Sequence, residues 1–308
     1  MFERLLVPLD GSEQAEATLP YAEELAARIG SEVVLLQVGE PERECSGTER
    51  QSYLAYLDRL ARTVRRMAAV RAARNSHPER REVRVQTVVL QGNPAERITE
   101  YAAGNAIGLI VMAAHGRSGL TRWAVGSVAD KVLRAARIPI ALITGPARDV
   151  PTRDKGALDK ALLPLDGSKI GEAALEYVEE LAPKMGTELT LLQVVEHKYV
   201  AYSAEIGGYI PYPQEWLTAT EDAARSYLAG VEARLKAKGI TVSSRVEIGL
   251  AADTIVDVAE KMKADFIAMS THGRSGVGRW VFGSVADRVI HAGKMPVFLV
   301  RARPEESK

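Results

Sequence analysis

Short apolar runs alternate with helical patterns of apolar residues along the first half of the chain. Residues 4–9, 32–38 and 107–113 are nearly continuous apolar runs, which are typical of strands buried on both faces. The β-branched, alternating residues at 82–90 and the run at 139–144 predict two further strands. Between these segments apolar residues recur every three or four positions, which predicts helices.

Residues at the ends of these segments support the predicted helices. Ser12 is a suitable N-cap and Gly30 a suitable C-terminal stop for one helix that runs between them. Pro94 predicts the start of another helix, because proline is favoured at the first helical position. Two more helices are expected, a long one at about 49–74 and a shorter one at 126–136.

The second half of the chain repeats the first. Leu-Val-Pro-Leu-Asp-Gly-Ser at 6–12 returns as Leu-Leu-Pro-Leu-Asp-Gly-Ser at 162–168, and His-Gly-Arg-Ser-Gly at 115–119 returns at 272–276. Equivalent residues are 156 apart early in the repeat and 157 apart later, so the second copy has one net insertion between residues 194 and 249. The repeat predicts strands near residues 160–165, 188–195, 241–248, 265–270 and 296–301.

Two domains are therefore expected, at residues 1–146 and 157–308, joined by a polar linker that contains Pro and Gly. Alternation of helices with apolar strands predicts an α/β fold, in which helices cover both faces of a parallel sheet. With right-handed crossovers, this gives two tandem flavodoxin-like, doubly wound domains. Each is expected to contain a five-stranded parallel sheet of order 3-2-1-4-5.

The composition narrows the classes of protein that fit. The formal net charge is zero, which argues against nucleic acid as a general partner. The arginine-rich stretch at 59–84 is interpreted as the solvated face of a long helix, with a patch for polyanions as the alternative. No apolar run is long enough for a membrane span, and the N-terminus lacks signal-peptide features. Since Cys45 is the single cysteine and excludes an intrachain disulfide, we expect a cytoplasmic protein.

The repeated phrases fall where a ligand site is expected. In open α/β sheets, ligands bind beyond the carboxyl ends of the strands where the strand order reverses, which here is between strands 1 and 4. Asp10 ends strand 1 and suits a ribose hydroxyl or a metal-bound water, or else it caps the first helix. Gly116 lets the backbone after strand 4 approach an anion. Gly126 and Ser127 then open a helix whose N–H groups favour phosphate.

With both phrases present twice, the chain resembles a tandem universal stress protein along both halves. Members of that family that bind ATP carry Gly-x-x-Gly-x9-Gly-Ser/Thr after strand 4. The two copies read Ala113-x-x-Gly116-x9-Gly126-Ser127 and Ser270-x-x-Gly273-x9-Gly283-Ser284. Both copies replace the first glycine of the motif. This replacement bears on nucleotide affinity rather than on the fold, and it costs little free energy unless the backbone at that position needs a positive φ.

The resemblance implies one ATP site in each domain, with Mg²⁺ accompanying the nucleotide. Asp10 and Asp166 are expected near the ribose, and the backbone of Val38 and Val194 near the adenine. The predicted site of the first domain consists of Pro8, Asp10, Val38, Ala113, Gly116, Arg117, Gly126, Ser127 and Val128. The matching residues of the second domain are Pro164, Asp166, Val194, Ser270, Gly273, Arg274, Gly283, Ser284 and Val285.

These features favour an ATP-binding universal stress protein that acts as a nucleotide-dependent regulator of the stress response. The alternatives are a slow ATP hydrolase and a stress protein that no longer binds nucleotide. No P-loop and no dinucleotide-binding fingerprint occur in the sequence. No paired carboxylate and no His-x-x-x-His ligand set accompanies His115 or His272, so no catalytic residue and no metal ligand is assigned.

Two further expectations concern assembly. In the family, two strand 5 edges pair antiparallel, and a linker of about a dozen residues holds the two copies close enough for this pairing within one chain. Residues 197–216 contain four tyrosines and Trp216, unlike the polar stretch of the first copy. They predict a lid or a docking surface, or a segment that packs on its own domain. We expect a homodimer of the whole chain and leave open an unidentified protein partner, with no membrane partner.

Overall fold

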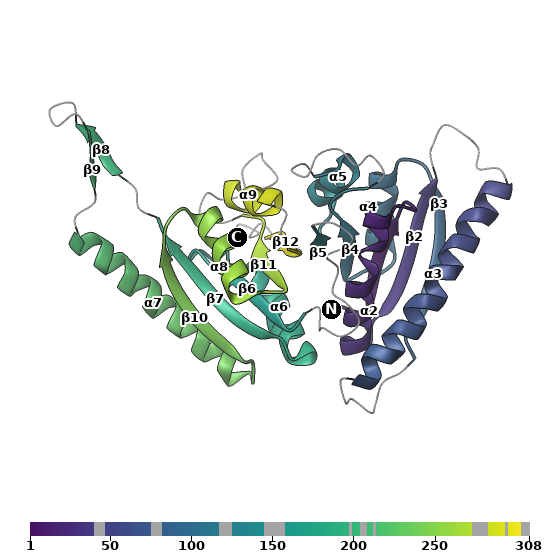
Figure 1. Cartoon of the computed structure of the whole chain (residues 1–308), viewed down its shortest axis with the longest axis horizontal. Helices are drawn as coiled ribbons and strands as arrows, with labels where there is room; N and C mark the ends of the chain where they lie inside the picture. Colours follow the sequence, from purple (N-terminus) through teal and green to yellow (C-terminus); the bar gives the residue numbers. More distant parts are fainter. Residues whose placement is uncertain are drawn as a thin grey trace, which may run out of the picture. The chain divides into compact units, whose positions relative to one another are not determined.

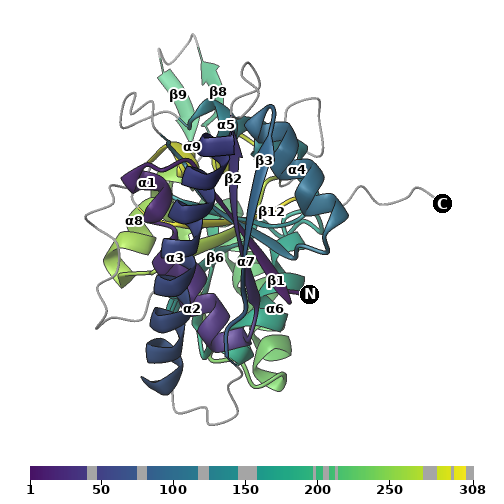
Figure 2. The same cartoon turned by 90° about the vertical axis from the view of Figure 1, so that its right-hand side faces the viewer.

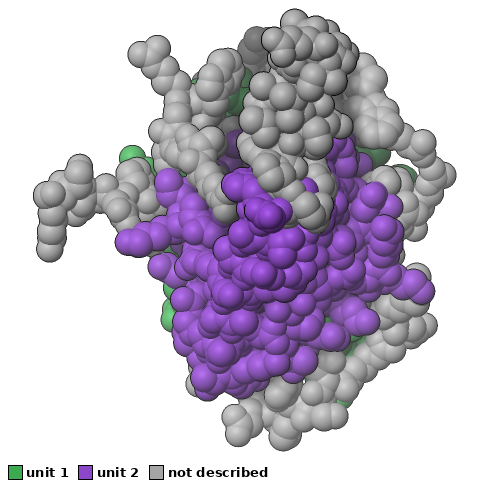
Figure 3. Space-filling view, turned by 90° about the vertical axis from the view of Figure 1, so that its left-hand side faces the viewer, with its two compact units in different colours: residues 1–159, 293–301 green, residues 160–292, 302–308 purple. Residues whose placement is uncertain are grey.

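Both copies of the repeat fold into alternating strands and helices. The computed structural model describes residues 1–39, 47–74, 82–116, 125–144, 158–196, 199–203, 208–211, 214–272, 283–292 and 295–302. It divides into two units, one of residues 1–159 and 293–301 and the other of residues 160–292 and 302–308. Figure 3 colours the units and shows one face of the second.

The strands of the first copy form a parallel sheet in the first unit (Figure 1). They are β1 (Arg4–Leu9), β2 (Glu32–Gly39), β3 (Val85–Gln91), β4 (Leu109–Ala113) and β5 (Ile140–Ile143). Their order is β3-β2-β1-β4-β5, and every neighbouring pair is parallel. The predicted order 3-2-1-4-5 is therefore confirmed for this copy, and the order reverses between β1 and β4.

Helices cover both faces of this sheet. They are α1 (Glu13–Glu16), α2 (Leu19–Ile29), α3 (Gly47–Arg74), α4 (Pro94–Gly104) and α5 (Ser127–Ala135). α2 packs against α3, and α4 packs against α5. Because the connections on the two sides of β1 run in opposite directions along the sheet, right-handed crossovers place these pairs on opposite faces (Figures 1 and 2).

The single helix expected between Ser12 and Gly30 is wrong, since the structure breaks it into α1 and α2. Pro20 lies at the start of α2, where its ring removes an N–H donor and crowds the preceding turn. Ser12 caps α1 as predicted, and its side chain accepts a hydrogen bond from the backbone N–H of Ala15. Gly30 ends α2 as predicted, in the left-handed conformation at φ 76°.

The second copy repeats this arrangement in the second unit. Its strands are β6 (Lys160–Pro164), β7 (Glu188–Val195), β10 (Val242–Ile248) and β11 (Phe266–Ser270), in the parallel order β10-β7-β6-β11. Its helices are α6 (Ala173–Met185), α7 (Gln214–Ala237), α8 (Ala251–Met262) and α9 (Ser284–Ala292). Within the aromatic segment 197–216, β8 (Tyr199–Ser203) and β9 (Gly208–Pro211) pair antiparallel as a separate ribbon.

The last strand, β12 (Val297–Val300), belongs to the first unit although it comes from the second copy. It pairs antiparallel with β5, with Val297 opposite Leu142 and Leu299 opposite Ile140. The ring of Phe298 lies 6.4 Å from that of Phe2, centroid to centroid. The predicted antiparallel pairing of the two strand 5 edges within one chain is thus confirmed.

The core of each unit consists of the apolar runs that predicted the strands. Leu5, Leu6 and Val7 of β1 are completely buried, as are Leu162 and Leu163 of β6. Their burial on both faces explains why these strands read as continuous rather than alternating apolar runs. Across the described residues, no helix is both long enough and apolar enough to cross a membrane.

An ionic network inside the first unit joins α2 to α3. The Arg71 guanidinium lies 2.7 Å from Glu24 and 3.4 Å from Glu23, and all three side chains are buried. Glu24 also pairs with Arg28 at 2.5 Å. Arg71 is therefore an exception to the solvated face predicted for 59–84, because a charged side chain can be buried when opposite charges surround it. Among the described residues of that stretch, five other arginines are exposed: Arg59, Arg62, Arg65, Arg66 and Arg84.

Replacing Arg71 by Ala should destabilise the first unit by about 3–5 kcal/mol, because Glu23 and Glu24 would remain buried with their shared partner removed. The measurement is the free energy of unfolding in urea. Arg66→Ala is the matched control, since Arg66 is exposed on the same helix, and it should change stability by no more than about 0.5 kcal/mol. Equal losses in the two variants would contradict a special role for the buried network.

Candidate functional site

The turn after β1 holds Asp10 against the segment that follows β4. Asp10 Oδ1 accepts hydrogen bonds from the backbone N–H of Ser12 at 3.0 Å and from its hydroxyl at 2.6 Å. The other oxygen, Oδ2, faces Gly116, where a Cβ atom would lie only 2.5 Å from it. Gly116 is therefore required for close approach, and Asp10 both supports the helix cap and borders the switch point of the sheet.

A hydrogen bond fastens the start of α5 to the end of β4. The N–H of Gly126 donates to the carbonyl oxygen of Ala114 at 2.8 Å. A Cβ on Gly126 would lie 3.2 Å from the same oxygen, which is a tight contact. Gly126 is also the N-cap of α5 and supplies no side-chain cap. The first-turn N–H groups of α5 are thus not used by a capping side chain, which suits them to hold an anion.

The predicted residues of the first copy gather at this edge of the sheet. Pro8 and Asp10 lie at the end of β1, and Val38 lies near the end of β2. Ala113 and Gly116 lie at and just after the end of β4. Gly126, Ser127 and Val128 form the cap and first turn of α5. The remaining predicted residue, Arg117, lies outside the described residues.

The second copy builds the same turn with one change. Asp166 Oδ1 accepts from the N–H of Ser168 at 2.9 Å and from its hydroxyl at 2.7 Å. The N–H of Gly283 donates to the carbonyl of Thr271 at 2.7 Å, as Gly126 does in the first copy. Gly171 stands where the first copy has Ala15, and a Cβ there would lie 2.2 Å from Asp166 Oδ1. The turn around Asp166 is therefore tighter.

A cavity of about 560 Å³ opens at the carboxyl ends of β6, β7 and β11. Its volume falls in the range of small-molecule sites. It is lined by seven of the nine residues predicted for the second copy: Pro164, Asp166, Val194, Ser270, Gly283, Ser284 and Val285. The other two, Gly273 and Arg274, lie outside the described residues. The structure thus brings together residues that are spread over 122 positions of the sequence.

The cavity also has walls that the sequence analysis did not assign. Ile255 of α8 and Met269 of β11 add apolar surface, and Gln193 of β7 adds an amide. Trp216 and Thr220 line it from the start of α7. The sequence could have indicated Gln193, because a glutamine interrupts the same apolar strand in both copies. Trp216 had only the signal of an aromatic residue in a segment where the copies differ.

The replaced first glycine of the motif causes no backbone strain. Neither Ala113 nor Ser270 has a positive φ, so neither position needs glycine for its conformation. The Ser270 hydroxyl accepts a hydrogen bond from the backbone N–H of His272 at 3.4 Å. The Thr271 hydroxyl lies 3.0 Å from His272 Nδ1. The second copy therefore places two hydroxyl groups where the first has the methyl groups of Ala113 and Ala114.

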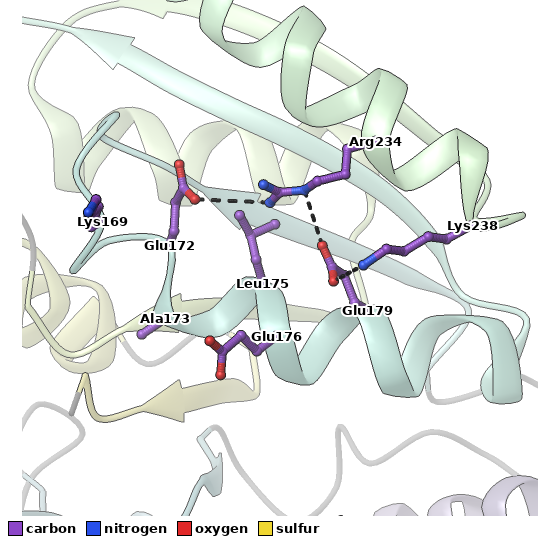
Figure 4. A pocket seen from close by; sticks show the side chains of 8 residues that line it. All are labelled: Lys169, Glu172, Ala173, Leu175, Glu176, Glu179, Arg234 and Lys238. Carbon is purple, nitrogen blue, oxygen red and sulfur yellow. Dashed lines mark hydrogen bonds and ion pairs between the residues drawn. The ribbon is translucent and has the colours of Figure 1, made fainter. Parts of the chain in front are cut away.

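A second hollow in the second unit is less suited to a ligand. It has a volume of about 330 Å³ and lies between α6 and α7 (Figure 4). Charged side chains line it, and they pair with one another: Arg234 lies 3.3 Å from Glu179 and 4.0 Å from Glu172, and Lys238 also pairs with Glu179. Because these charges already have partners within the hollow, the cavity at the strand ends is the better candidate site.

Comparison with known proteins decides the family. The family model described as the universal stress protein family matches residues 1–144 and again residues 158–301. The chain belongs to this family. Two successive matches over nearly the whole chain make it a tandem universal stress protein.

Individual universal stress proteins match one or both halves. A protein of Methanocaldococcus jannaschii is 29% identical over 152 residues, which are 48% of this chain and 84% of that protein. One of Mycolicibacterium smegmatis is 24% identical over 306 residues, 97% of each chain. The crystal structure of a universal stress protein from Archaeoglobus fulgidus superposes with a TM-score of 0.70 at 21% identity, covering 98% of this chain and 99% of that one. That likeness shows the shared fold.

Beside the site, both universal stress protein copies carry a tyrosine–glutamate pair. The Tyr56 hydroxyl donates to Glu16 at 3.0 Å, and the Tyr227 hydroxyl donates to Glu172 at 2.7 Å. The glutamates are 156 residues apart but the tyrosines 171 apart. Relative to the first copy, the second copy thus has 15 additional residues before Tyr227, around β8 and β9, and 14 fewer residues after it. The difference is the one net insertion.

These tyrosines resist ionisation. Burial raises the pKa of Tyr56 and of Tyr227, and the negative charges of the paired glutamate and of Asp10 or Asp166 raise it further. In the unfolded chain a tyrosine ionises near pH 10. Above that pH the unfolded state loses these two protons while the folded state keeps them. Their contribution to stability is therefore complete below about pH 10 and declines as the pH rises further.

The variant with both Tyr56→Phe and Tyr227→Phe should show a smaller loss of stability between about pH 10 and pH 11.5 than the wild type. At pH 7 it should be less stable by about 1 kcal/mol for each hydrogen bond removed. Both effects are measured as the free energy of unfolding in urea at each pH. Tyr53→Phe, in the same helix as Tyr56, should keep the wild-type stability at pH 7. Parallel pH curves for wild type and double variant would show that the pairs do not control this decline.

Proposed function

We propose that each half of the chain, residues 1–146 and 157–308, binds one ATP with Mg²⁺, and that the protein acts as a nucleotide-dependent regulator of the stress response. The observation that carries the proposal is the cavity of about 560 Å³ lined by seven residues chosen from the sequence alone. It combines apolar walls, the carboxylates of Asp166 and Glu196 and a helix start, which are surfaces that suit the base, the ribose and the phosphates of a nucleotide.

Each part of the cavity suits one part of the nucleotide. The backbone N–H groups at Gly283 and Ser284 begin α9 and suit the phosphates. Asp166 has acceptor oxygens for ribose hydroxyls, and one of them is already held by Ser168. Apolar side chains such as Val194, Ile255 and Met269 suit the base. In the first half, the close packing of Asp10, Gly116 and Gly126 supports the same assignment.

We propose that the triphosphate itself supplies most of the coordination of Mg²⁺. In the part of the chain that the structure describes, no three His, Cys, Asp or Glu side chains gather into a metal-binding group. Magnesium in nucleotide sites commonly takes one or two carboxylates together with phosphate oxygens and waters. Asp10 and Asp166 are the carboxylates best placed to orient such waters.

Thermal denaturation with and without ATP and Mg²⁺ tests the function directly. ATP at about one hundred times its dissociation constant stabilises a binding domain by about 2.7 kcal/mol, which corresponds to a rise in melting temperature of about 5–10 °C. An unchanged melting temperature at millimolar ATP would favour a stress protein without a nucleotide. Steady hydrolysis faster than about 1 s⁻¹ would instead favour the enzyme.

Gly126→Asp and Gly283→Asp should each abolish one of two ATP sites. The new carboxylate would cap α5 or α9 and occupy the N–H groups proposed for the phosphates, and its charge would repel them. Calorimetric titration should give two ATP per wild-type chain, one per single variant and none for the double variant.

Gly104→Asp and Gly230→Asp are the matched controls, one in each half. Both glycines lie in helices with open space at the Cβ position, and both variants should keep two sites. Two ATP bound by the Gly126→Asp and Gly283→Asp double variant would refute the assignment.

We also propose that the regulator is a homodimer. Support comes from the β8–β9 ribbon of residues 199–203 and 208–211, which has no counterpart among the described residues of the first copy. A single-chain mass at micromolar concentration in sedimentation equilibrium would contradict this, without affecting the nucleotide sites.

A further inference from the structure

Gln193 lies at the wall of the cavity with an unsatisfied amide. It is only 7% exposed, between Leu192 and Val194 of β7, and it lines the cavity. Its Oε1 is buried and has no hydrogen-bond partner among the described residues. Buried amide oxygens nearly always have a partner, and leaving one unpaired is costly. Such a group at a cavity wall indicates a ligand that completes its hydrogen bonds.

The first copy has the same feature at the same position. Gln37 of β2 is 4% exposed, and its Oε1 likewise has no partner among the described residues. Gln37 and Gln193 are 156 residues apart and follow the same Leu-Leu pair. Each glutamine directly precedes the valine whose backbone is expected near the base. An amide near the carboxyl end of a buried strand, present in both copies, is thus close to the position expected for the base of a nucleotide.

Trp216 adds a flat surface to the second cavity. It lies in the first turn of α7, lines the cavity and is 44% exposed. An indole at the wall of a cavity presents a broad flat ring on which an aromatic ligand can stack. By the 171-residue spacing of the tyrosines, the equivalent residue of the first copy is Cys45, which lies outside the described residues and carries no aromatic ring.

We infer that the second domain selects the base of its nucleotide with two side chains, Trp216 stacking on the face of the ring and Gln193 hydrogen-bonding its edge. This inference rests on the proposed binding of ATP. A carboxamide offers a donor and an acceptor, which match the amino group and ring nitrogen along one edge of adenine. The last torsion of a glutamine side chain is soft, so a modest rotation brings either end of the amide to the ligand.

The edge contact is tested in the full chain carrying Gly126→Asp, which leaves only the second site. The probes are ATP and purine riboside triphosphate, whose base lacks the amino group, titrated by calorimetry. This chain should bind ATP about 3–10-fold more tightly, since one hydrogen bond distinguishes the two ligands. Gln193→Leu should reduce this preference to less than about twofold. Gln37→Leu, the equivalent change in the disabled site, should leave the preference intact.

The face contact is tested in the same background with ATP and inorganic tripolyphosphate. Trp216→Leu should weaken ATP binding about 5–50-fold, as expected for the loss of one stacked base, whereas Trp216→Phe should weaken it less than about fivefold. Tripolyphosphate has no base, so its affinity should be the same in all three chains.

The outcomes separate this inference from the proposed function. If Gln193→Leu keeps the preference for ATP, or Trp216→Leu weakens tripolyphosphate as much as ATP, base selection by these side chains is refuted while ATP binding stands. If the Gly126→Asp chain is folded by circular dichroism but binds no ATP, the function proposed for the second domain fails and this inference fails with it.

Discussion

The candidate site depends on one backbone hydrogen bond, from the residue just before a helix back to the residue that follows the preceding strand. Gly126 donates to Ala114 in the first copy, and Gly283 donates to Thr271 in the second. This bond brings the start of α5 or α9 to the end of β4 or β11, next to the aspartate that follows β1 or β6. Glycine leaves room for it: a Cβ on Gly126 would lie 3.2 Å from the carbonyl oxygen that accepts the bond, which is a tight contact, and one on Gly283 would lie 3.4 Å from it. In a parallel sheet all strands end at the same edge, so the bond places helix N–H groups, a carboxylate and apolar strand ends around one space.

Much of the fold and of the candidate site could be predicted from the sequence, because both depend on local patterns that occur twice. Buried strands of a parallel sheet need continuous apolar runs, and the switch point follows from their order. The residues that could not be predicted depend on tertiary contacts. Arg71 is buried because Glu23 and Glu24 of another helix face it, which the sequence of α3 cannot reveal. Pro20 is present in the sequence and could have predicted the break, but the capping serine and the periodic apolar pattern suggested one uninterrupted helix. Trp216 lies where the two copies differ in sequence, so the repeat offered no aromatic counterpart from which to predict its position at the cavity.

The two copies share a framework but differ in the chemistry at the strand ends. The hydroxyl groups of Ser270 and Thr271 replace two methyl groups of the first copy, and Gly171 replaces Ala15. The changes at Ser270 and Thr271 leave the strand order and the start of the following helix unchanged, since neither position needs a positive φ. Gly171 differs from Ala15 because a Cβ there would lie 2.2 Å from Asp166 Oδ1. The two copies thus share the same framework, while the side chains at the strand ends differ between them.

The position of β12 has a consequence for how the chain is made. Residues 1–144 contain all five strands of the first sheet, yet the edge strand β5 obtains its antiparallel neighbour from residues 297–300. During synthesis the N-terminal sheet can form long before this neighbour leaves the ribosome, since domains tend to fold as they emerge. Until then β5 presents an uncovered apolar edge, which is a risk for aggregation. Residues 297–300 therefore cover the edge formed by residues 140–143. A chain truncated shortly before β12 would contain nearly every residue of the protein but would leave the edge of β5 unpaired.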